Sequence, residues 1–310
     1  MEITTKCNLN CRTCTIDKTK SLDVNLNTAK EIMKECKSLG IKAVRFTGGE
    51  PLLNKYIENI LSYARKKGFY VLLNTNATAI STATLKLLEK TVDNILISLQ
   101  GFNQESDRAL TKSNIDFKRK IANMVRLKSK IPIVRVGTVI SKTLIKNMEK
   151  YYRLIRRIGI DNWELYRPIV NNNDSEFIIS KKELLKVMGF LFEIKKRGMK
   201  VKIANPVPFC ITNNIDVSLA TLLGATADDG HSRIVWDAKG YFKPSYFINM
   251  NLGRNIKKSW ESPFLKEIRS LKYLPIKCRE CKYLKWCMGG SRAITKIATN
   301  SYFKKDPLFK

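Results

Sequence analysis

The sequence predicts an α/β protein, a partial (β/α)6 TIM-like barrel followed by a small C-terminal domain. The first observation is an alternation of short apolar runs with longer amphipathic segments over residues 1–198. The second is that several amphipathic segments end at glycine, as helices commonly do. The third is a change of pattern after Met199, where a hairpin and a cysteine cluster replace the alternation. We therefore expect two domains, 1–198 and 199–310.

Six apolar runs have the length of buried strands, and each is followed by a helical pattern. The expected strands are 3–6, 43–47, 70–73, 94–98, 133–138 and 163–166. The expected helices are 28–39, 57–67, 82–90, 117–128, 146–158 and 181–196. Such alternation predicts a parallel sheet with helices outside, whose chemistry lies at the C-terminal ends of the strands. Six strand–helix units are more than one half of an open nucleotide-binding fold contains and fewer than the eight of a complete barrel. A partial barrel therefore fits.

The C-terminal region predicts a β-hairpin and a helix. Residues 233–236 and 241–246 flank a turn that contains Gly240, which fits a hairpin. Residues 255–271 form an amphipathic helical pattern, and a cysteine cluster follows.

Composition excludes several classes of protein. The 310 residues are 44% hydrophobic and 27% charged, which is a globular mix and excludes intrinsic disorder. There is neither a run of about 18 apolar residues nor a secretory signal pattern, so we expect a cytoplasmic protein without a membrane span. The net charge of +30 comes from lysines spread along the chain. This favours a solvated basic surface, while an acidic peptide or nucleic acid stays possible as a partner.

The eight cysteines are the most informative residues. Six of them fall into two clusters, at 7–14 and at 278–287, while Cys36 and Cys210 stand alone. Because a reducing cytosol disfavours disulfides, clustered cysteines indicate metal or thiol chemistry. Cys36 lies on the apolar side of the first expected helix and is expected to be a residue of the hydrophobic core. His231, the one histidine, is expected in a loop rather than in a catalytic role.

The first cluster, Cys7-x3-Cys11-x2-Cys14, directly follows the first expected strand. Three thiolates on one loop can hold three irons of a [4Fe–4S] cluster and leave the fourth iron without a protein ligand, whereas electron-transfer clusters normally have four cysteines. A zinc site is the alternative, although structural zinc takes four ligands.

This loop resembles that of the radical S-adenosylmethionine (radical SAM) superfamily. Thr47-Gly48-Gly49-Glu50-Pro51 follows the second expected strand and resembles the GGEP motif of that family. The resemblance implies that Thr47, Gly48, Gly49 and Glu50 contact SAM, with the Glu50 carboxylate on the methionine ammonium. It also implies a [4Fe–4S] cluster with an open site on Cys7, Cys11 and Cys14.

Three further SAM contacts are implied by position. Asn76 ends the third expected strand, Ser98 ends the fourth, and Arg108 lies where the family often has an arginine. For each of them, polarity at a strand end or helix capping is the alternative. Thr13 departs from the family pattern, because many members carry an aromatic residue there.

The second cluster, Cys278-x2-Cys281-x5-Cys287, resembles the SPASM or shorter twitch domains of one radical SAM branch. The resemblance implies one auxiliary [4Fe–4S] cluster on these three cysteines and Cys210.

The sequence departs from the SPASM pattern at two positions, and two alternatives to the auxiliary-cluster assignment stay open. Ser245 and Ser291 stand where that family has cysteines, so ligands for a second auxiliary cluster are missing. A zinc knuckle completed by Cys210 or His231 is one alternative. The other keeps Cys210 as a free thiol that returns a hydrogen atom to a substrate radical.

The function implied is reductive cleavage of SAM to a 5′-deoxyadenosyl radical that abstracts hydrogen from a substrate C–H bond. This covers peptide maturation and the oxidation or epimerisation of amino-sugars or other small metabolites. An electron donor such as flavodoxin or ferredoxin is expected as a partner, with a peptide or a small molecule as substrate. A radical SAM enzyme that modifies RNA, and a non-catalytic iron–sulfur or zinc scaffold, are the alternatives.

Overall fold

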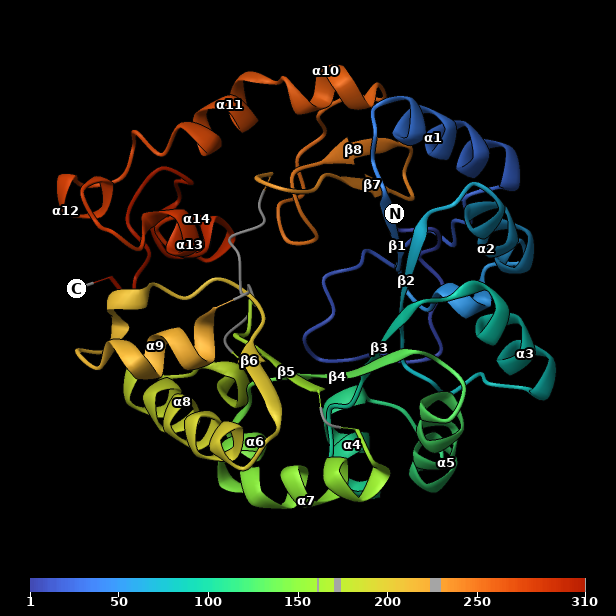
Figure 1. The fold of residues 1–310 in the computed structure, drawn as a ribbon, viewed down its shortest axis with the longest axis horizontal. Helices are drawn as coiled ribbons and strands as arrows, with labels where there is room; N and C mark the ends of the chain where they lie inside the picture. Colours follow the sequence, from blue (N-terminus) through green and yellow to red (C-terminus); the bar gives the residue numbers. More distant parts are fainter. Residues whose placement is uncertain (161, 170–173, 224–229, 310) are drawn as a thin grey trace. The chain divides into compact units, whose positions relative to one another are not determined.

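A computed structural model describes residues 1–160, 162–169, 174–223 and 230–309. Six strands form one sheet in chain order (Figure 1). They are β1 (Ala43–Phe46), β2 (Tyr70–Thr75), β3 (Asn94–Ser98), β4 (Ile133–Val139), β5 (Asn162–Tyr166) and β6 (Lys200–Ile203). The pairs β1–β2, β2–β3, β3–β4 and β5–β6 are parallel. The predicted α/β class with a parallel sheet is confirmed.

Helices follow the strands, and six of those up to residue 222 were predicted from the sequence. Those up to residue 222 are α1 (Leu26–Ser38), α2 (Ile57–Lys66), α3 (Thr82–Thr91), α4 (Gln104–Thr111), α5 (Phe117–Lys128), α6 (Lys142–Lys146), α7 (Met148–Ile158), α8 (Lys181–Lys196) and α9 (Ile215–Leu222). Helices α1, α2 and α3 succeed one another along one side of β1–β3 (Figure 1). The glycines after α1, α2 and α7 have positive φ, as a left-handed helix end requires.

The N-terminal segment differs from the prediction. Residues 3–6 do not form a strand. The N-terminal segment instead makes two isolated β-bridges, one between Glu2 and Thr47 and one between Thr4 and Asp23. The Ile3 amide donates to the Thr47 carbonyl (2.8 Å), so the N-terminal segment still lies beside the residue that directly follows β1. The regular ladder does not develop because Gly48, at a φ of 142°, turns the chain directly after Thr47. The sixth strand is instead β6, which the sequence analysis missed because only two apolar residues mark it.

Several other features differ from expectation. The helix expected at 146–158 is α7, which begins at Met148, and the separate short helix α6 precedes it. The helix expected at 255–271 is two helices, α10 (Ile256–Trp260) and α11 (Pro263–Ser270), because Pro263 cannot donate a backbone hydrogen bond and begins a new helix. Helices α4, α6 and α9 were not predicted. Cys36 was expected in the core and is only half-buried.

The predicted C-terminal hairpin is present, whereas three short helices beyond residue 271 were not predicted. Strands β7 (Val235–Asp237) and β8 (Tyr241–Lys243) pair around Gly240, and α12 (Ile276–Arg279), α13 (Leu284–Cys287) and α14 (Arg292–Thr299) follow. His231 lies in a loop, as predicted.

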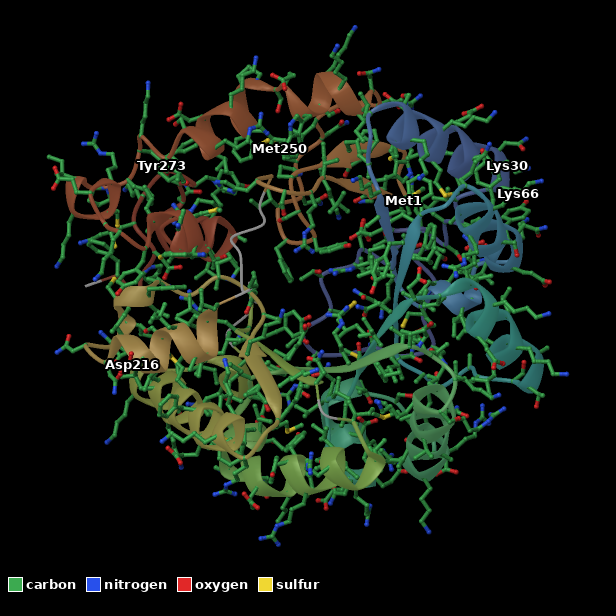
Figure 2. The ribbon with its side chains drawn as sticks, in the orientation of Figure 1. Met1, Lys30, Lys66, Asp216, Met250 and Tyr273 are labelled. Atoms are coloured by element: carbon green, nitrogen blue, oxygen red, sulfur yellow. The ribbon has the colours of Figure 1, made fainter. Side chains whose placement is uncertain are left out.

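The chain divides into two compact units. One comprises 1–137, 150–161 and 236–241, and the other 138–149, 162–235 and 242–310. This division is by contacts, and the expected domains 1–198 and 199–310 stay a prediction. In the first unit, alternate residues of β2 are buried, and α1 and α2 carry lysines such as Lys66 on their outer side (Figure 2). No helix in the described ranges is long and apolar enough to cross a membrane.

The second unit has its own core near the C-terminus. Ile169, Ile248 and Ala293 are buried together, and Met250 packs against them (Figure 2).

Asp306 is only 1% exposed. Its carboxylate accepts from the Arg167 guanidinium (2.9 and 3.2 Å).

Candidate functional site

The three N-terminal cysteines lie on one loop of the first unit. Cys7 and Cys11 are half-buried and Cys14 is exposed. The Cys14 amide donates to the Cys11 carbonyl (3.0 Å), and the Leu9 amide donates to the Cys7 sulfur (3.4 Å). Burial, with a smaller contribution from the neighbouring Cys14 and Cys7 thiols, raises the pKa of Cys11 to about 12. The three sulfurs are therefore close enough to act on one another, and a metal would have to displace their protons.

Helix α4 anchors this loop, although the sequence analysis did not anticipate the helix. The amides of Asn10 and Arg12 donate to the carbonyls of Thr111 (3.0 Å) and Leu110 (3.1 Å) in the last turn of α4. The last carbonyls of a helix accept no hydrogen bond from within the helix. The amides of the cysteine loop therefore pair with carbonyls that would otherwise lack a partner, and these hydrogen bonds hold the loop on the end of α4.

The two glycines after β1 are required by the N-terminal segment itself. A β-carbon on Gly48 would lie 2.3 Å from the Thr4 carbonyl oxygen, and one on Gly49 would lie 2.1 Å from the Lys6 carbonyl oxygen. The Gly49 amide donates to Thr4 (2.7 Å) and the Glu50 amide to Lys6 (2.6 Å). Close approach of two backbone segments therefore explains both glycines without any ligand, and it brings Glu50 to the cysteine loop.

Glu50 is a buried carboxylate with three hydrogen-bond donors. It is 1% exposed, and it accepts from the Thr75 hydroxyl (2.7 Å), the Asn76 amide (2.7 Å) and the Leu52 amide (3.2 Å). Burial raises its pKa to about 7, and the three hydrogen bonds oppose that rise. Glu50 in turn helps to raise the pKa of Cys7, so the carboxylate and the cysteine loop share one environment.

Asn76 connects Glu50 with the cysteine loop. Its side-chain nitrogen donates to the Asn8 side chain (2.8 Å) and lies 4.0 Å from the Cys7 sulfur. Its side-chain oxygen accepts from the Thr78 amide (3.0 Å) and hydroxyl (2.6 Å). The sequence analysis missed Asn8 and Thr78, because an isolated polar residue on a loop carries no pattern.

Ser98 and Arg108 are less closely associated with this loop. Ser98 ends β3 in register with Gly137 and is half-buried. Arg108 lies exposed on α4. Within the described part of the chain, no hydrogen bond joins either side chain to the cysteine loop, and their assignment to SAM stays a prediction.

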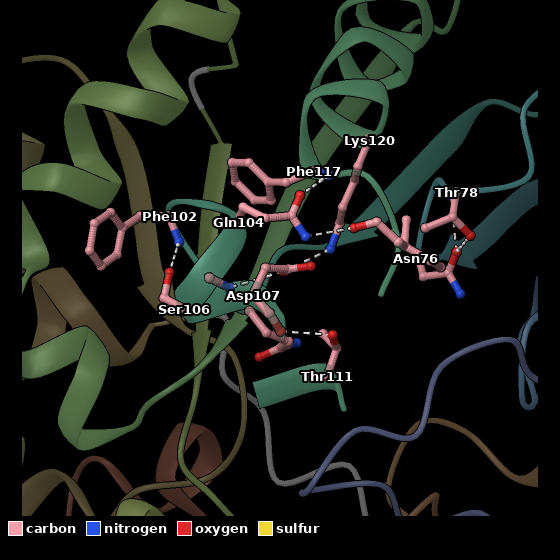
Figure 3. Close-up of polar contacts among 12 residues, drawn as sticks. Asn76, Thr78, Phe102, Gln104, Ser106, Asp107, Thr111, Phe117 and Lys120 are labelled. Atoms are coloured by element: carbon pink, nitrogen blue, oxygen red, sulfur yellow. Dashed lines mark hydrogen bonds and ion pairs between the residues drawn. The ribbon is translucent and has the colours of Figure 1, made fainter. Parts of the chain in front are cut away.

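A buried ion pair adjoins the loop and was also missed. Lys120 of α5 lies 3.1 Å from the Asp107 carboxylate of α4, with side chains only 1% and 5% exposed (Figure 3). The Gly101 amide also donates to Asp107 (3.2 Å). Lys120 is among the charges that lower the pKa of both Cys11 and Glu50.

The second group, of four cysteines, lies in the second unit. Cys278, Cys281 and Cys287 belong to the segment of α12 and α13, and Cys210 lies on a short 3₁₀ helix, η3 (Phe209–Ile211). Burial and the neighbouring thiols of Cys287, Cys210 and Cys281 raise the pKa of Cys278 to about 11. The fold thus brings Cys210 beside the C-terminal cysteines from 68 positions earlier in the chain.

The two serines that replace family cysteines have local structural roles. Ser245 accepts from the amides of Phe247 and Ile248 (both 3.2 Å). Ser291 caps α14, and its amide donates to Asp306 (2.9 Å).

Both cysteine groups offer the thiolates that iron–sulfur clusters use, three in the N-terminal group and four in the group that includes Cys210. In the described residues, no three His, Cys, Asp or Glu side chains converge closely enough to hold one metal ion.

The parallel α/β sheet, with a cysteine loop and a buried carboxylate beyond β1, defines the class of protein. The model of the radical SAM superfamily matches residues 1–158, just over half of the chain. The chain belongs to the radical SAM superfamily. Members use a [4Fe–4S] cluster and SAM, and the chain is an enzyme of this superfamily.

Relatives and solved structures match almost the whole chain. The AdoMet-dependent heme synthases of Methanosarcina barkeri and Nitratidesulfovibrio vulgaris are 24% and 20% identical, over 99% of this chain and 94% and 90% of their own. The anSMEcpe structure with AdoMet and the Cp18Cys peptide has a TM-score of 0.76 at 19% identity, covering 98% of this chain and 90% of that one. Streptococcus suis SuiB bound to the precursor peptide SuiA has a TM-score of 0.77 at 17% identity, covering 99% and 74%. These likenesses confirm the fold.

Proposed function

We propose that the chain holds its catalytic [4Fe–4S] cluster on Cys7, Cys11 and Cys14 and binds SAM beside it through Glu50. The observation that carries this proposal is the buried Glu50 carboxylate, which shares its surroundings with the cysteine loop and has its pKa raised to about 7. The reduced cluster would supply the electron that splits SAM into methionine and a 5′-deoxyadenosyl radical, which takes hydrogen from a substrate C–H bond.

Glu50 has the properties needed to hold an ammonium group. Each carboxylate oxygen has about two acceptor sites, and the three hydrogen bonds to Glu50 leave room for one more donor. A bound ammonium would also stabilise the ionised form, which burial alone disfavours. Thr75 and Asn76 fix the carboxylate, and the backbone at Gly48 and Gly49 holds Glu50 against the N-terminal segment. Thr47, Asn76, Ser98 and Arg108 stay in the proposal as further SAM contacts.

The second unit is proposed to hold one auxiliary [4Fe–4S] cluster in a SPASM/twitch-like fold. Its support is that the thiols of Cys287, Cys210 and Cys281 help to raise the pKa of Cys278, and those of Cys210 and Cys281 help to raise the pKa of Cys287. The Phe209 amide donates to the Cys287 sulfur (3.4 Å), which is the kind of hydrogen bond that tunes cluster sulfurs. As a ligand, Cys210 closes the cluster; as a free thiol, it would be the hydrogen donor.

Two substrate classes have specific support. A peptide is supported by the fold shared with anSMEcpe and SuiB, whose structures contain peptides, and by the +30 charge, which would attract an acidic one. A small molecule is supported by the heme synthases, which match 99% of this chain. A flavodoxin or ferredoxin would supply the electron in either case.

Anaerobic reconstitution tests the proposal. The protein should bind about eight irons per chain, because each cube holds four. With SAM and dithionite it should release 5′-deoxyadenosine, and the triple change of Cys7, Cys11 and Cys14 to Ala should abolish this while keeping about four irons. Bound zinc without SAM cleavage would refute the proposal. Deuterium transfer from a labelled acidic peptide or haem precursor into 5′-deoxyadenosine identifies the substrate class.

A further inference from the structure

A short basic segment carries three cysteines of the second group. Residues 276–287 contain four basic side chains and one acidic one, Glu280, so 4 − 1 gives a net charge of +3 over twelve residues. All five charged side chains are exposed, and so is Cys281. Two large apolar side chains of this segment also reach solvent, Ile276 (61% exposed) and Trp286 (37%). Exposed apolar area with a charged rim is typical of a surface that binds another protein.

Three aromatic rings connect the second cysteine group with this surface. The Phe209 amide donates to the Cys287 sulfur (3.4 Å), and the centre of the Phe209 ring lies 6.2 Å from that of Tyr283. The Tyr283 ring lies 6.3 Å from the Trp286 ring, and the Tyr283 carbonyl accepts from the Cys287 amide (3.0 Å). Phe209 is buried, Tyr283 is half-buried and Trp286 is exposed. The row therefore leads from a proposed cluster ligand to the protein surface.

Two lysines flank the exposed end of this aromatic row. Lys285 Nζ lies 4.2 Å from the centre of the Trp286 ring, and Lys282 Nζ lies 5.2 Å from that of Tyr283. A cation–π contact holds each ammonium beside its ring. We call these four residues the Trp286 surface. The lysines cover ring faces on which a nucleic-acid base would stack, whereas positive charge beside an aromatic anchor suits an acidic protein.

We propose that the Trp286 surface docks an acidic one-electron carrier protein, which passes its electron to the auxiliary cluster. This rests on the proposed function, in which Cys278, Cys281, Cys287 and Cys210 hold that cluster. The anionic flavin hydroquinone of a flavodoxin loses one electron and becomes the neutral semiquinone, and the oxidised cluster gains that electron. Complementary charge steers such encounters, and the interfaces of electron carriers are small, so a few anchoring side chains can define one. A second copy of this chain would be repelled, because it carries the same charge of +30.

Binding of an oxidised acidic flavodoxin to the anaerobically reconstituted protein tests the docking. Isothermal titration calorimetry at physiological ionic strength gives the dissociation constant. The double variant Lys282→Glu/Lys285→Glu should weaken binding about tenfold, because two attractive charges become repulsive. Trp286→Ala should also weaken it about tenfold, because an aromatic anchor is lost. The matched control, Lys257→Glu/Lys258→Glu, reverses two other exposed lysines on α10 and should stay within about twofold of the wild type, because charges away from the contact are screened.

Electron entry is measured on the triple Ala variant of Cys7, Cys11 and Cys14, which keeps only the auxiliary cluster. Stopped-flow mixing with flavodoxin hydroquinone follows the reduction of this cluster. The second-order rate constant should fall about tenfold when Lys282→Glu/Lys285→Glu is added, and it should fall for the unreversed surface as salt is raised. Reduced methyl viologen, a small cation, should reduce the charge-reversed protein at least as fast as before, which shows that the cluster itself is intact.

The outcomes separate this inference from the proposed function. An equal loss of flavodoxin affinity in the two double variants means that the attraction is non-specific, and it overturns the docking. Single-stranded RNA that displaces flavodoxin and loses affinity in Trp286→Ala also overturns it, because the surface would then bind nucleic acid. Unchanged reduction by flavodoxin hydroquinone in the charge-reversed protein overturns the electron step. A triple variant that loads no iron refutes the auxiliary cluster of the proposed function, while the flavodoxin affinities still decide the docking.

Discussion

The raised pKa of Glu50 makes the stability of the iron-free protein depend on pH. Its pKa is about 7 in the folded chain, against an ordinary value of 4.5 for a glutamate side chain. Between these values the folded state binds more protons than the unfolded state, so the free energy of unfolding falls as pH rises. From pH 5 to pH 8 this single group removes about 2.5 kcal/mol of stability. The loss is complete only above the folded-state pKa.

Urea unfolding of the wild type and of Glu50→Gln at pH 5 and pH 8 measures this effect. Glutamine does not titrate, so the variant should gain about 2.5 kcal/mol relative to the wild type over this range, whatever the other groups contribute. Circular dichroism at each pH shows that both proteins are folded before urea is added. Parallel stability profiles for the two proteins would mean that Glu50 is not buried as the structure shows, and the argument for an ammonium site would lose its basis.

Three further substitutions test other parts of the structure. Gly49→Ala should lower the free energy of unfolding by about 3 kcal/mol, because its β-carbon would meet backbone at 2.1 Å. Cys210→Ala should lower the iron of the reconstituted protein from about eight to about four per chain, because the auxiliary cluster loses a ligand. Asp306→Asn should cost about 3 kcal/mol, because the Arg167 guanidinium stays buried without its carboxylate. Urea unfolding measures the first and third changes, and colorimetric iron analysis the second.

The first two of these predictions have matched control variants, and each prediction has an outcome that would contradict it. Gly40→Ala has nothing within 4 Å of the new β-carbon and a φ of 73°, so it should cost only about 1 kcal/mol. An equal loss in both glycine variants would contradict the clash. Cys36→Ala should leave iron unchanged. Full iron in Cys210→Ala, together with SAM cleavage and no finished product, would favour the hydrogen-donor role. Unchanged stability in Asp306→Asn would show that the pair with Arg167 contributes nothing.

Local patterns were enough to predict most of the helices. The bounds of the helices at 117–128 and 181–196 were predicted without error, because their apolar periodicity and capping residues are both strong. Helix α4 was missed because its eight residues carry only two buried apolar or small positions and its role is to receive the cysteine loop. The strand β6 and the isolated bridges of residues 2–4 depend on partners elsewhere in the chain. Register and pairing of this kind have no local signal.

The sequence by itself determined the two cysteine clusters, the Gly-Gly-Glu motif and the alternation of strands with helices, because each depends on neighbouring residues. Only the tertiary structure brought Cys210 to the C-terminal cysteines and placed Lys120 and Asp107 together. It also showed that Gly48 and Gly49 serve the packing of the N-terminal segment. The physical reason is that burial, charge and steric contact between distant segments depend on where the backbone goes. A lysine surrounded by water and a lysine with 1% exposure are the same letter in the sequence.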